Sequence, residues 1–340
     1  MLVVVSDESE DRHLTGPEHP EQPSRLGAAL GGIDAAGLSD AVVRLPARPA
    51  TDEELQRVHC ESYLEALRTF CVTGGGLLDP DTVASPGSWD TALLAAGSSL
   101  VAVEALRRGE GDAAFVMARP PGHHATRDQA MGFCLLNNVA VAAAALAADG
   151  QRVLVVDWDV HHGNGTQDAF WDDPRVLYGS VHQWPLYPGT GRAVETGGPS
   201  APGGTVNVPV PGGATGDVAL AAFDEVLVPA AERFRPDWVL VSAGFDAHRR
   251  DPLADLEWSA GDFADLAARV GEMAPAPGRT IYVLEGGYDL EALRLSVGAV
   301  LAQAVGVPFR PEPATSGGPG SDAVAAAQRV YEQVGVVPGA

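Results

Sequence analysis

Short apolar runs alternate along this chain with longer segments that carry apolar residues at helical spacing. Most of the short runs are apolar at nearly every position, which is typical of strands covered on both faces. The predicted strands are residues 2–6, 113–118, 153–156, 176–180, 205–208, 238–242 and 280–284. This alternation predicts an α/β fold, a mainly parallel β-sheet flanked by helices on both faces.

The longer segments predict helices that would cover this sheet. They are residues 52–70, 89–108, 138–149, 217–234, 259–272 and 290–305. Pro229 lies inside the fourth of them and predicts a kink or a division, because proline lacks the N–H that a helix needs. We expect a single domain over residues 1–310, with no internal repeat. A Pro- and Gly-rich linker and an amphipathic segment would follow in residues 311–340.

Composition narrows the classes of function. The 340 residues include 22 Lys plus Arg against 45 Asp plus Glu, a formal net charge of -23. We therefore expect no nucleic-acid or anionic-membrane partner, because both are bound by clustered basic residues. The 3 cysteines are widely spaced, which does not suggest a disulfide framework or a thiolate zinc site. The first residues lack the regions of a signal peptide, and we expect a soluble, cytoplasmic protein.

The predicted strand near residue 155 leads into a cluster of polar side chains. In extended backbone Asp157, Asp159 and His161 share one face, while Trp158 and Val160 point the other way. Two carboxylates held together next to an apolar core repel each other unless a cation or a proton lies between them. The pattern therefore predicts a metal site rather than a solvent-facing strand end.

Three further predicted strands end in residues of similar chemistry. Asp246 follows one of them, Tyr288 follows another, and His123 with His124 follows a third. Ligands of parallel α/β sheets bind outside the carboxyl ends of the strands, so these side chains are expected at one edge.

Asp159, His161 and Asp246 would supply three ligands and leave a position open for water, as catalytic zinc sites require. Zn²⁺ is the expected ion. Fe²⁺ remains an alternative, because it also suits mixed nitrogen and oxygen ligands.

A series of short motifs runs in order along most of the chain. They are HPEQPSRL (19–26), RPPGHHA (119–125), GFCLLNN (132–138), DWDVHHGNG (157–165), PGTG (188–191), SAGFD (242–246) and EGGY (285–288). The series resembles the histone deacetylase and acetylpolyamine amidohydrolase family, in its class II-like form with the arginase–deacetylase fold. The resemblance implies a three-layer sandwich and a metal-dependent amide hydrolase.

The resemblance also implies catalytic roles for particular residues. Asp159, His161 and Asp246 would be the zinc ligands, and the remaining group would be His123, His124, Tyr288, Asp157 and Asn164. His124 would be the general base, with Asn164 beside it, and His123 its electrostatic partner, oriented by Asp157. Tyr288 would donate its hydroxyl to the amide oxygen. An amide is a poor electrophile, so such polarisation and a positioned donor are required.

The substrate channel and a second cation site are further implications of the resemblance. The residues implied at the channel are Gly132, Phe133, Tyr187, Leu253 and Asp81, the last where relatives hold the substrate backbone. A structural potassium ion is implied at backbone oxygens of Asp157, Asp159 and His161 together with Ser180 and Val181.

We therefore expect deacetylation of acetyl-lysine in proteins or peptides, or of a related small acetylated amine, with release of acetate. An acetylpolyamine amidohydrolase is the first alternative, but Leu253 stands where that branch has a glutamate for a distant ammonium. A binuclear manganese ureohydrolase would need further carboxylates, and Gly163 and His248 occupy the relevant positions. A catalytically silent acyl-lysine binding module would typically have lost one of the reactive residues. The oligomeric state stays open.

Overall fold

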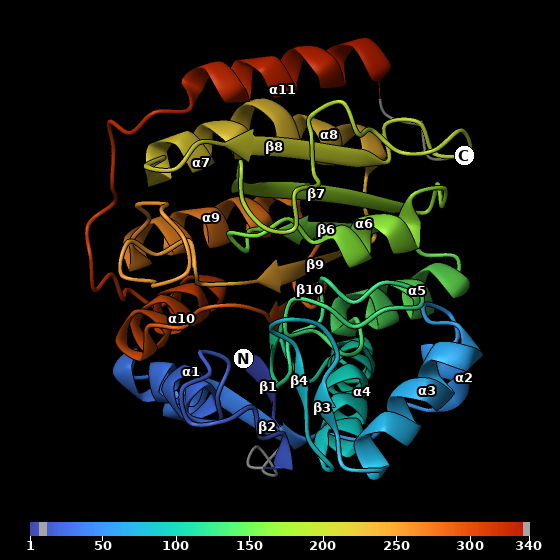
Figure 1. Ribbon diagram of the computed structural model, residues 1–340. Helices are drawn as coiled ribbons and strands as arrows, with labels where there is room; N and C mark the ends of the chain where they lie inside the picture. The colour runs from blue at the N-terminus through green and yellow to red at the C-terminus, as the bar shows by residue number, and fades with distance from the viewer. Residues whose placement is uncertain (7–11, 336–340) are drawn as a thin grey trace.

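Eight parallel strands form the centre of the computed structural model, which describes residues 1–6 and 12–335. Their spatial order is β2-β1-β5-β10-β9-β6-β7-β8 (Figure 1). They are β1 (Leu2–Ser6), β2 (Val42–Pro46), β5 (Ala113–Met117), β6 (Val153–Asp157), β7 (Val176–Gln183), β8 (Thr205–Val210), β9 (Trp238–Ala243) and β10 (Thr280–Leu284). The predicted fold class is confirmed, and each predicted strand is present.

Helices cover both faces of this sheet because its strands are apolar on both sides. In β1, Leu2 and Val4 pack into one core cluster, and Val3 and Val5 pack into the other. The first cluster contains α1 (Ser24–Ala35), α7 (Gly216–Ala222), α8 (Val228–Phe234), α9 (Ala260–Met273), α10 (Leu290–Ala304) and α11 (Ser321–Val334). The second contains α2 (Asp52–Leu55), α3 (Glu61–Val72), α4 (Ser88–Arg107) and α5 (Asn138–Ala148). Figure 1 shows the two helical layers on opposite sides of the sheet.

One predicted helix, residues 52–70, is wrong as a continuous element, because it divides into α2 and α3. The break lies around His59, whose Nδ1 lies 2.8 Å from the Thr126 carbonyl oxygen and whose Nε2 accepts from the Asn137 N–H. The Cys60 N–H donates to the Arg127 carbonyl at 2.9 Å instead of to its own helix. These long-range hydrogen bonds replace the intrahelical ones.

The division expected at Pro229 is confirmed. A π-helical segment, Phe223–Leu227, separates α7 from α8, and Pro229 is the second residue of α8. Several elements escaped the sequence analysis: α1, β2, α6 (Asn164–Phe170) and the hairpin of β3 (Gly76–Leu77) and β4 (Val83–Ala84).

Two helices have particular positions. α4 is the one helix in the described part of the chain with the length and mean hydropathy of a membrane span, and 78% of that window is buried inside the protein. α11 lies along β8, the last strand of the sheet (Figure 1). Its buried side chains are Val324, Ala327 and Tyr331, and the Arg233 guanidinium lies 5.1 Å from the Tyr331 ring centre.

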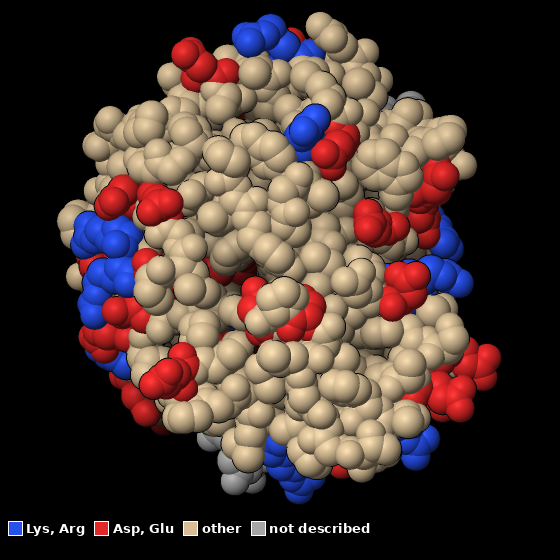
Figure 2. Space-filling view, in the orientation of Figure 1, with Lys and Arg blue, Asp and Glu red and all other residues tan. Residues whose placement is uncertain are grey.

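The surface carries more acidic than basic side chains. Figure 2 shows one face on which acidic groups border a hollow near the middle. The 22 residues counted as Lys plus Arg are all arginines, and the chain contains no lysine. Each of these guanidinium groups therefore keeps its charge at any pH at which the protein is folded.

Candidate active site

Four neighbouring strands bring the predicted site residues to one edge of the sheet. β5, β10, β9 and β6 are adjacent in that order. Their carboxyl ends lead to the His123–His124 pair, Tyr288, Asp246 and the Asp159–His161 pair, respectively. Neighbouring parallel strands end at the same edge, which is why residues more than a hundred positions apart meet there.

The candidate metal centre consists of Asp159, His161 and Asp246. Each of the three side chains has one potential ligand atom, and these three atoms all lie within 4.8 Å of one another. His161 Nδ1 lies 3.1 Å from Asp159 Oδ1 and 3.2 Å from Asp246 Oδ2. Both carboxylates are buried, and burial and then the charge of Asp159 raise the pKa of Asp246.

This donor set fits a divalent cation. Asp246 Oδ2 is buried, and no hydrogen bond to it is present in the described part of the chain, so it is free to coordinate an ion. A Cβ on Gly286 would collide with the carboxylates of Asp246 and Asp159, so glycine keeps the space beside them open. Two carboxylates and one imidazole neutralise a divalent charge and suit zinc or ferrous iron.

The tandem histidines have different partners and therefore different charges. His123 Nδ1 donates to Asp157 Oδ2 at 3.0 Å, and His124 Nδ1 donates to Asn164 Oδ1 at 2.8 Å. Burial opposes the charged form of His123, but Asp159 and Asp157 together raise its pKa to about 10. Burial and then the charge of His123 lower the pKa of His124 well below its usual value. His124 is therefore neutral, with the Nε2 lone pair free to accept a proton.

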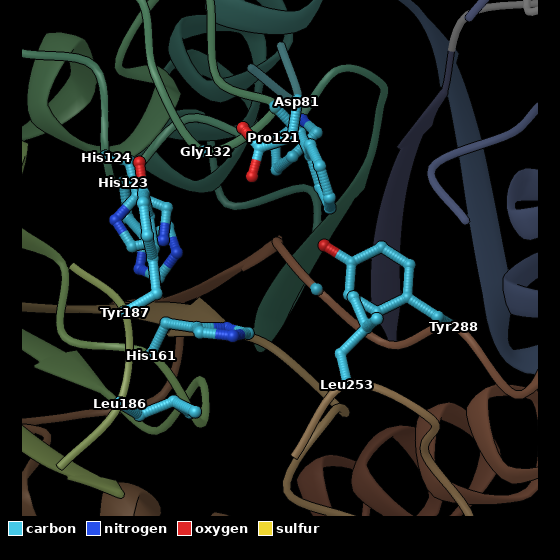
Figure 3. A pocket seen from close by; sticks show the side chains of 12 residues that line it. Asp81, Pro121, His123, His124, Gly132, His161, Leu186, Tyr187, Leu253 and Tyr288 are labelled. Atoms are coloured by element: carbon cyan, nitrogen blue, oxygen red, sulfur yellow. The ribbon is translucent and has the colours of Figure 1, made fainter. Parts of the chain in front are cut away.

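Tyr288 lies across the cavity from the histidines, with its hydroxyl directed into the open space between them (Figure 3). Burial raises the pKa of this phenol well above its usual value, so it stays a hydrogen-bond donor. The Tyr288 N–H donates to Asp251 Oδ2 at 2.7 Å, and the Arg25 guanidinium lies 4.8 Å from the ring centre.

A narrow cavity of about 200 Å³ connects these groups to the surface. All the residues predicted to bind substrate line it: Asp81, Gly132, Phe133, Tyr187 and Leu253. Pro121, Leu186 and Gly286 also line it, although the sequence analysis gave them no role. Figure 3 shows the labelled side chains arranged around this space.

The aromatic walls are held close to the histidines. Gly132 has a φ of +54°, and a Cβ there would lie 2.5 Å from His124 Cδ2, so only glycine lets the chain pass. The next residue, Phe133, also has a positive φ of 68°, and its N–H donates to Thr82 Oγ1 at 3.0 Å. The ring of Phe133 meets that of Tyr288 edge-on, with 5.7 Å between ring centres.

The residues predicted around potassium lie on adjacent strands. Asp157 at the end of β6 is opposite Ser180 in β7, and Val181 follows. The side chain of Ser180 is turned toward His182, with 2.9 Å between Oγ and Nδ1. The potassium ion itself stays a prediction.

Sequence reasoning missed a buried carboxylate that holds the histidine loop. Glu285 Oε2 accepts from the N–H groups of Gly122 and His123 at 2.6 and 3.1 Å, and Oε1 accepts from Ser242 Oγ at 3.1 Å. Burial raises the pKa of Glu285 to about 7. The only signal in the sequence is a glutamate directly after an apolar strand, within the EGGY motif.

Comparisons with known proteins show the family of this chain. Residues 19–304 match the histone deacetylase domain. A probable deacetylase of Archaeoglobus fulgidus is 40% identical over 293 residues, covering 85% of this chain and 81% of that protein. A histone deacetylase-like amidohydrolase of Pseudomonas aeruginosa is 43% identical over 277 residues, covering 80% and 72%.

A solved structure has the same fold over nearly the whole chain. The crystal structure of the HDA15 HD domain superposes with a TM-score of 0.89 at 36% sequence identity, covering 97% of this chain and 96% of that one. The sequence and the architecture thus point to the same family. The chain belongs to the histone deacetylase family and is a hydrolase of the deacetylase type.

Proposed function

We propose that this protein is a zinc-dependent amidohydrolase that removes acetyl groups from acetyl-lysine in proteins or peptides, or from related small acetylated amines. Acetate and a free amine are the products. One observation carries the proposal: the Asp159, His161 and Asp246 donors lie together, and His161 lines the same cavity as the tandem histidines and Tyr288. A structural potassium ion near β6 and β7 belongs to the same proposal.

When bound, the zinc ion would supply Lewis-acid polarisation of the acetyl carbonyl. His124 would take a proton from the attacking water and return it to the departing amine, because its Nε2 is unprotonated. His123, charged beside Asp157, would stabilise negative charge that develops next to it. Tyr288 would donate its hydroxyl to the carbonyl oxygen as that oxygen becomes negative.

The lining of the cavity supports a lysine-like substrate. Phe133 and Tyr187 are apolar surfaces on which the methylene stem of an acyl-lysine can pack. Leu253 also lines the cavity, and its side chain cannot pair with an ammonium group. We therefore favour acetyl-lysine over acetylated polyamines, which keep a distant positive charge.

The test is a substrate panel with controlled metal content. The purified protein is stripped with a chelator, then reconstituted with Zn²⁺ or Fe²⁺, and assayed on acetyl-lysine peptides, acetylspermidine and longer acyl-lysines. We expect the stripped protein to be inert, Zn²⁺ to restore acetate release, and acetyl-lysine peptides to be preferred. A reconstituted protein that hydrolyses none of these amides, or a metal-free protein that hydrolyses them, would contradict the proposal.

Tyr288→Phe provides the matched inactive variant. It should bind as much zinc as the wild type, yet lose about 10²- to 10³-fold in kcat, as removal of an oxyanion donor does. Tyr282→Phe is the control, because Tyr282 lies on β10 but packs in the core and does not line the cavity. Equal activity of Tyr288→Phe and wild type would remove the phenol from the mechanism.

A further inference from the structure

A buried carboxylate, Asp251, connects two walls of the cavity that come from different parts of the chain. It lies in the loop between β9 and α9, which also carries Asp246 and Leu253. Asp251 Oδ2 accepts from the Tyr288 N–H at 2.7 Å, and Oδ1 accepts from the Leu253 N–H at 3.0 Å. Only 7% of Asp251 is exposed, so its oxygens depend on protein donors, which include the Asp289 N–H beside these two.

The backbone before Tyr288 needs such a support. Two glycines precede it, and Gly287 has a φ of +116°, a conformation with no side chain to fix it. Gly286 accepts from the Phe245 N–H at 3.0 Å, and Gly287 accepts from Arg25 Nε at 2.7 Å. Among residues 1–6 and 12–335, no hydrogen bond to the Tyr288 hydroxyl is present, so its main chain and ring packing set the place of that hydroxyl.

We propose that Asp251 is a positioning residue for Tyr288, fixing the Tyr288 main chain relative to Leu253 so that the phenol points at the substrate carbonyl. The inference rests on the proposed function, which gives the phenol its role. It assigns a positioning role to a residue that lies outside all of the motifs described above. A misplacement of the hydroxyl by a fraction of the hydrogen-bond length would weaken its donation where charge develops.

A second link joins the same two segments at the surface and offers a control. Arg250 lies 3.2 Å from Asp289, the residue after Tyr288, with 46% and 25% of the two side chains exposed. An exposed ion pair of this kind contributes little to holding a segment. Asp289 also caps α10 through the Ala292 N–H, a role that asparagine can keep.

The primary test is Asp251→Asn. An amide offers one acceptor oxygen to two N–H donors, so one of the two hydrogen bonds is lost with almost no change in volume. We expect kcat on an acetyl-lysine peptide to fall about 10- to 100-fold, as small misplacements do, with little change in KM, zinc content or melting temperature. Amide hydrogen exchange at Tyr288, measured on the metal-free protein, should become faster. Asp289→Asn should change neither kcat nor this exchange.

A double-mutant cycle distinguishes positioning from a general structural role. In the Tyr288→Phe background, Asp251→Asn should cost nothing further, because the hydroxyl that it positions is gone. The same cycle is measured without turnover through the dissociation constant of octanohydroxamic acid. The four zinc-loaded proteins are the wild type, the two single variants and the double variant. An equal loss in both backgrounds, or unchanged Tyr288 exchange with full kcat, would overturn the inference. If the wild type hydrolyses no acetylated amine, the proposed function fails, while the exchange and hydroxamate measurements still test Asp251.

Discussion

At the scale of residues, a group of buried charges supports the wall of the cavity. Glu21 Oε2 accepts from the Arg119 guanidinium at 2.7 Å, and Glu21 Oε1 lies 3.3 Å from the Arg25 guanidinium. Burial alone would raise the pKa of Glu21, but His13 and Arg119 hold it well below its usual range. Arg25 also donates to the Gly287 carbonyl, so this ionised cluster continues to the segment that carries Tyr288.

Glu21→Gln should therefore destabilise the fold by about 3–5 kcal/mol, because the variant removes a buried negative charge that faces two buried guanidinium groups. Chemical denaturation at neutral pH measures this change. Glu53→Gln is the control, since Glu53 is 88% exposed and its ion pair within the described residues is with Arg57, and it should change stability by less than about 0.5 kcal/mol. Equal stability of the two variants would contradict the role of the buried cluster.

The stability difference between the wild type and Glu21→Gln should depend on pH. The folded pKa of Glu21 lies below its unfolded value of 4.5, so the ionised group stabilises the fold above that pH. This contribution is lost as the pH falls below the unfolded pKa toward the folded one. The difference in stability between wild type and Glu21→Gln should thus be constant near neutrality and narrow below pH 4.5.

The ligand-type residues of the site were predictable, and so were Asp157 and Asn164 beside the histidines, but two further supports were not. Asp159 and His161 are two positions apart just after an apolar run, a pattern that can be read directly from the sequence. Asp251 and Glu285 are ordinary acidic residues in the sequence, and their importance comes from the N–H groups that they meet after folding. Such contacts depend on the path of a loop, which local patterns do not encode.

At the scale of elements, prediction succeeded where both faces of a strand are buried. The central strands are uniformly apolar for that reason. β2 lies at the edge of the sheet, is only partly buried and contains Arg44, so its apolar signal is weak. β3 and β4 have two residues each, too short for any periodicity. The prediction of one continuous helix over residues 52–70 was wrong because the hydrogen bonds of His59 outweighed helical propensity.

α11 protects the last strand of the sheet, and Val324→Asp tests this. β8 pairs with β7 on one side only, and α11 lies against it with Val324 1% exposed. A carboxylate at this position would be buried without a partner, so α11 should detach and uncover apolar surface and the strand edge. Light scattering after size exclusion should then show association of the variant.

The control for this prediction is Gln333→Asp, on the exposed side of the same helix. It should leave the mass in solution and the melting temperature unchanged. If Val324→Asp keeps the wild-type mass and melting temperature, α11 is not needed to cover β8.

At the scale of the whole molecule, the net charge of -23 should affect encounter with substrate. Acidic side chains border a hollow on the face shown in Figure 2, so positively charged peptides are attracted from a distance. The Debye length shortens from about 30 Å at 0.01 M salt to about 10 Å at 0.1 M, which weakens this attraction.

Between 0.01 M and 0.1 M salt, kcat/KM for an acetyl-lysine peptide with flanking arginines should therefore fall roughly several-fold, because screening weakens electrostatic steering. A peptide with flanking glutamates should show the opposite trend, and one with neutral flanks should change little. Equal salt dependence for the three peptides would show that the surface charge does not select substrates.

The exclusive use of arginine has a consequence for the chemistry of the cell around this protein. Reactive acyl donors modify amines, and no side chain of this molecule offers one. A guanidinium stays protonated and resists such acylation. If the proposed reaction is correct, the protein removes from lysine a mark that it cannot carry on a lysine of its own.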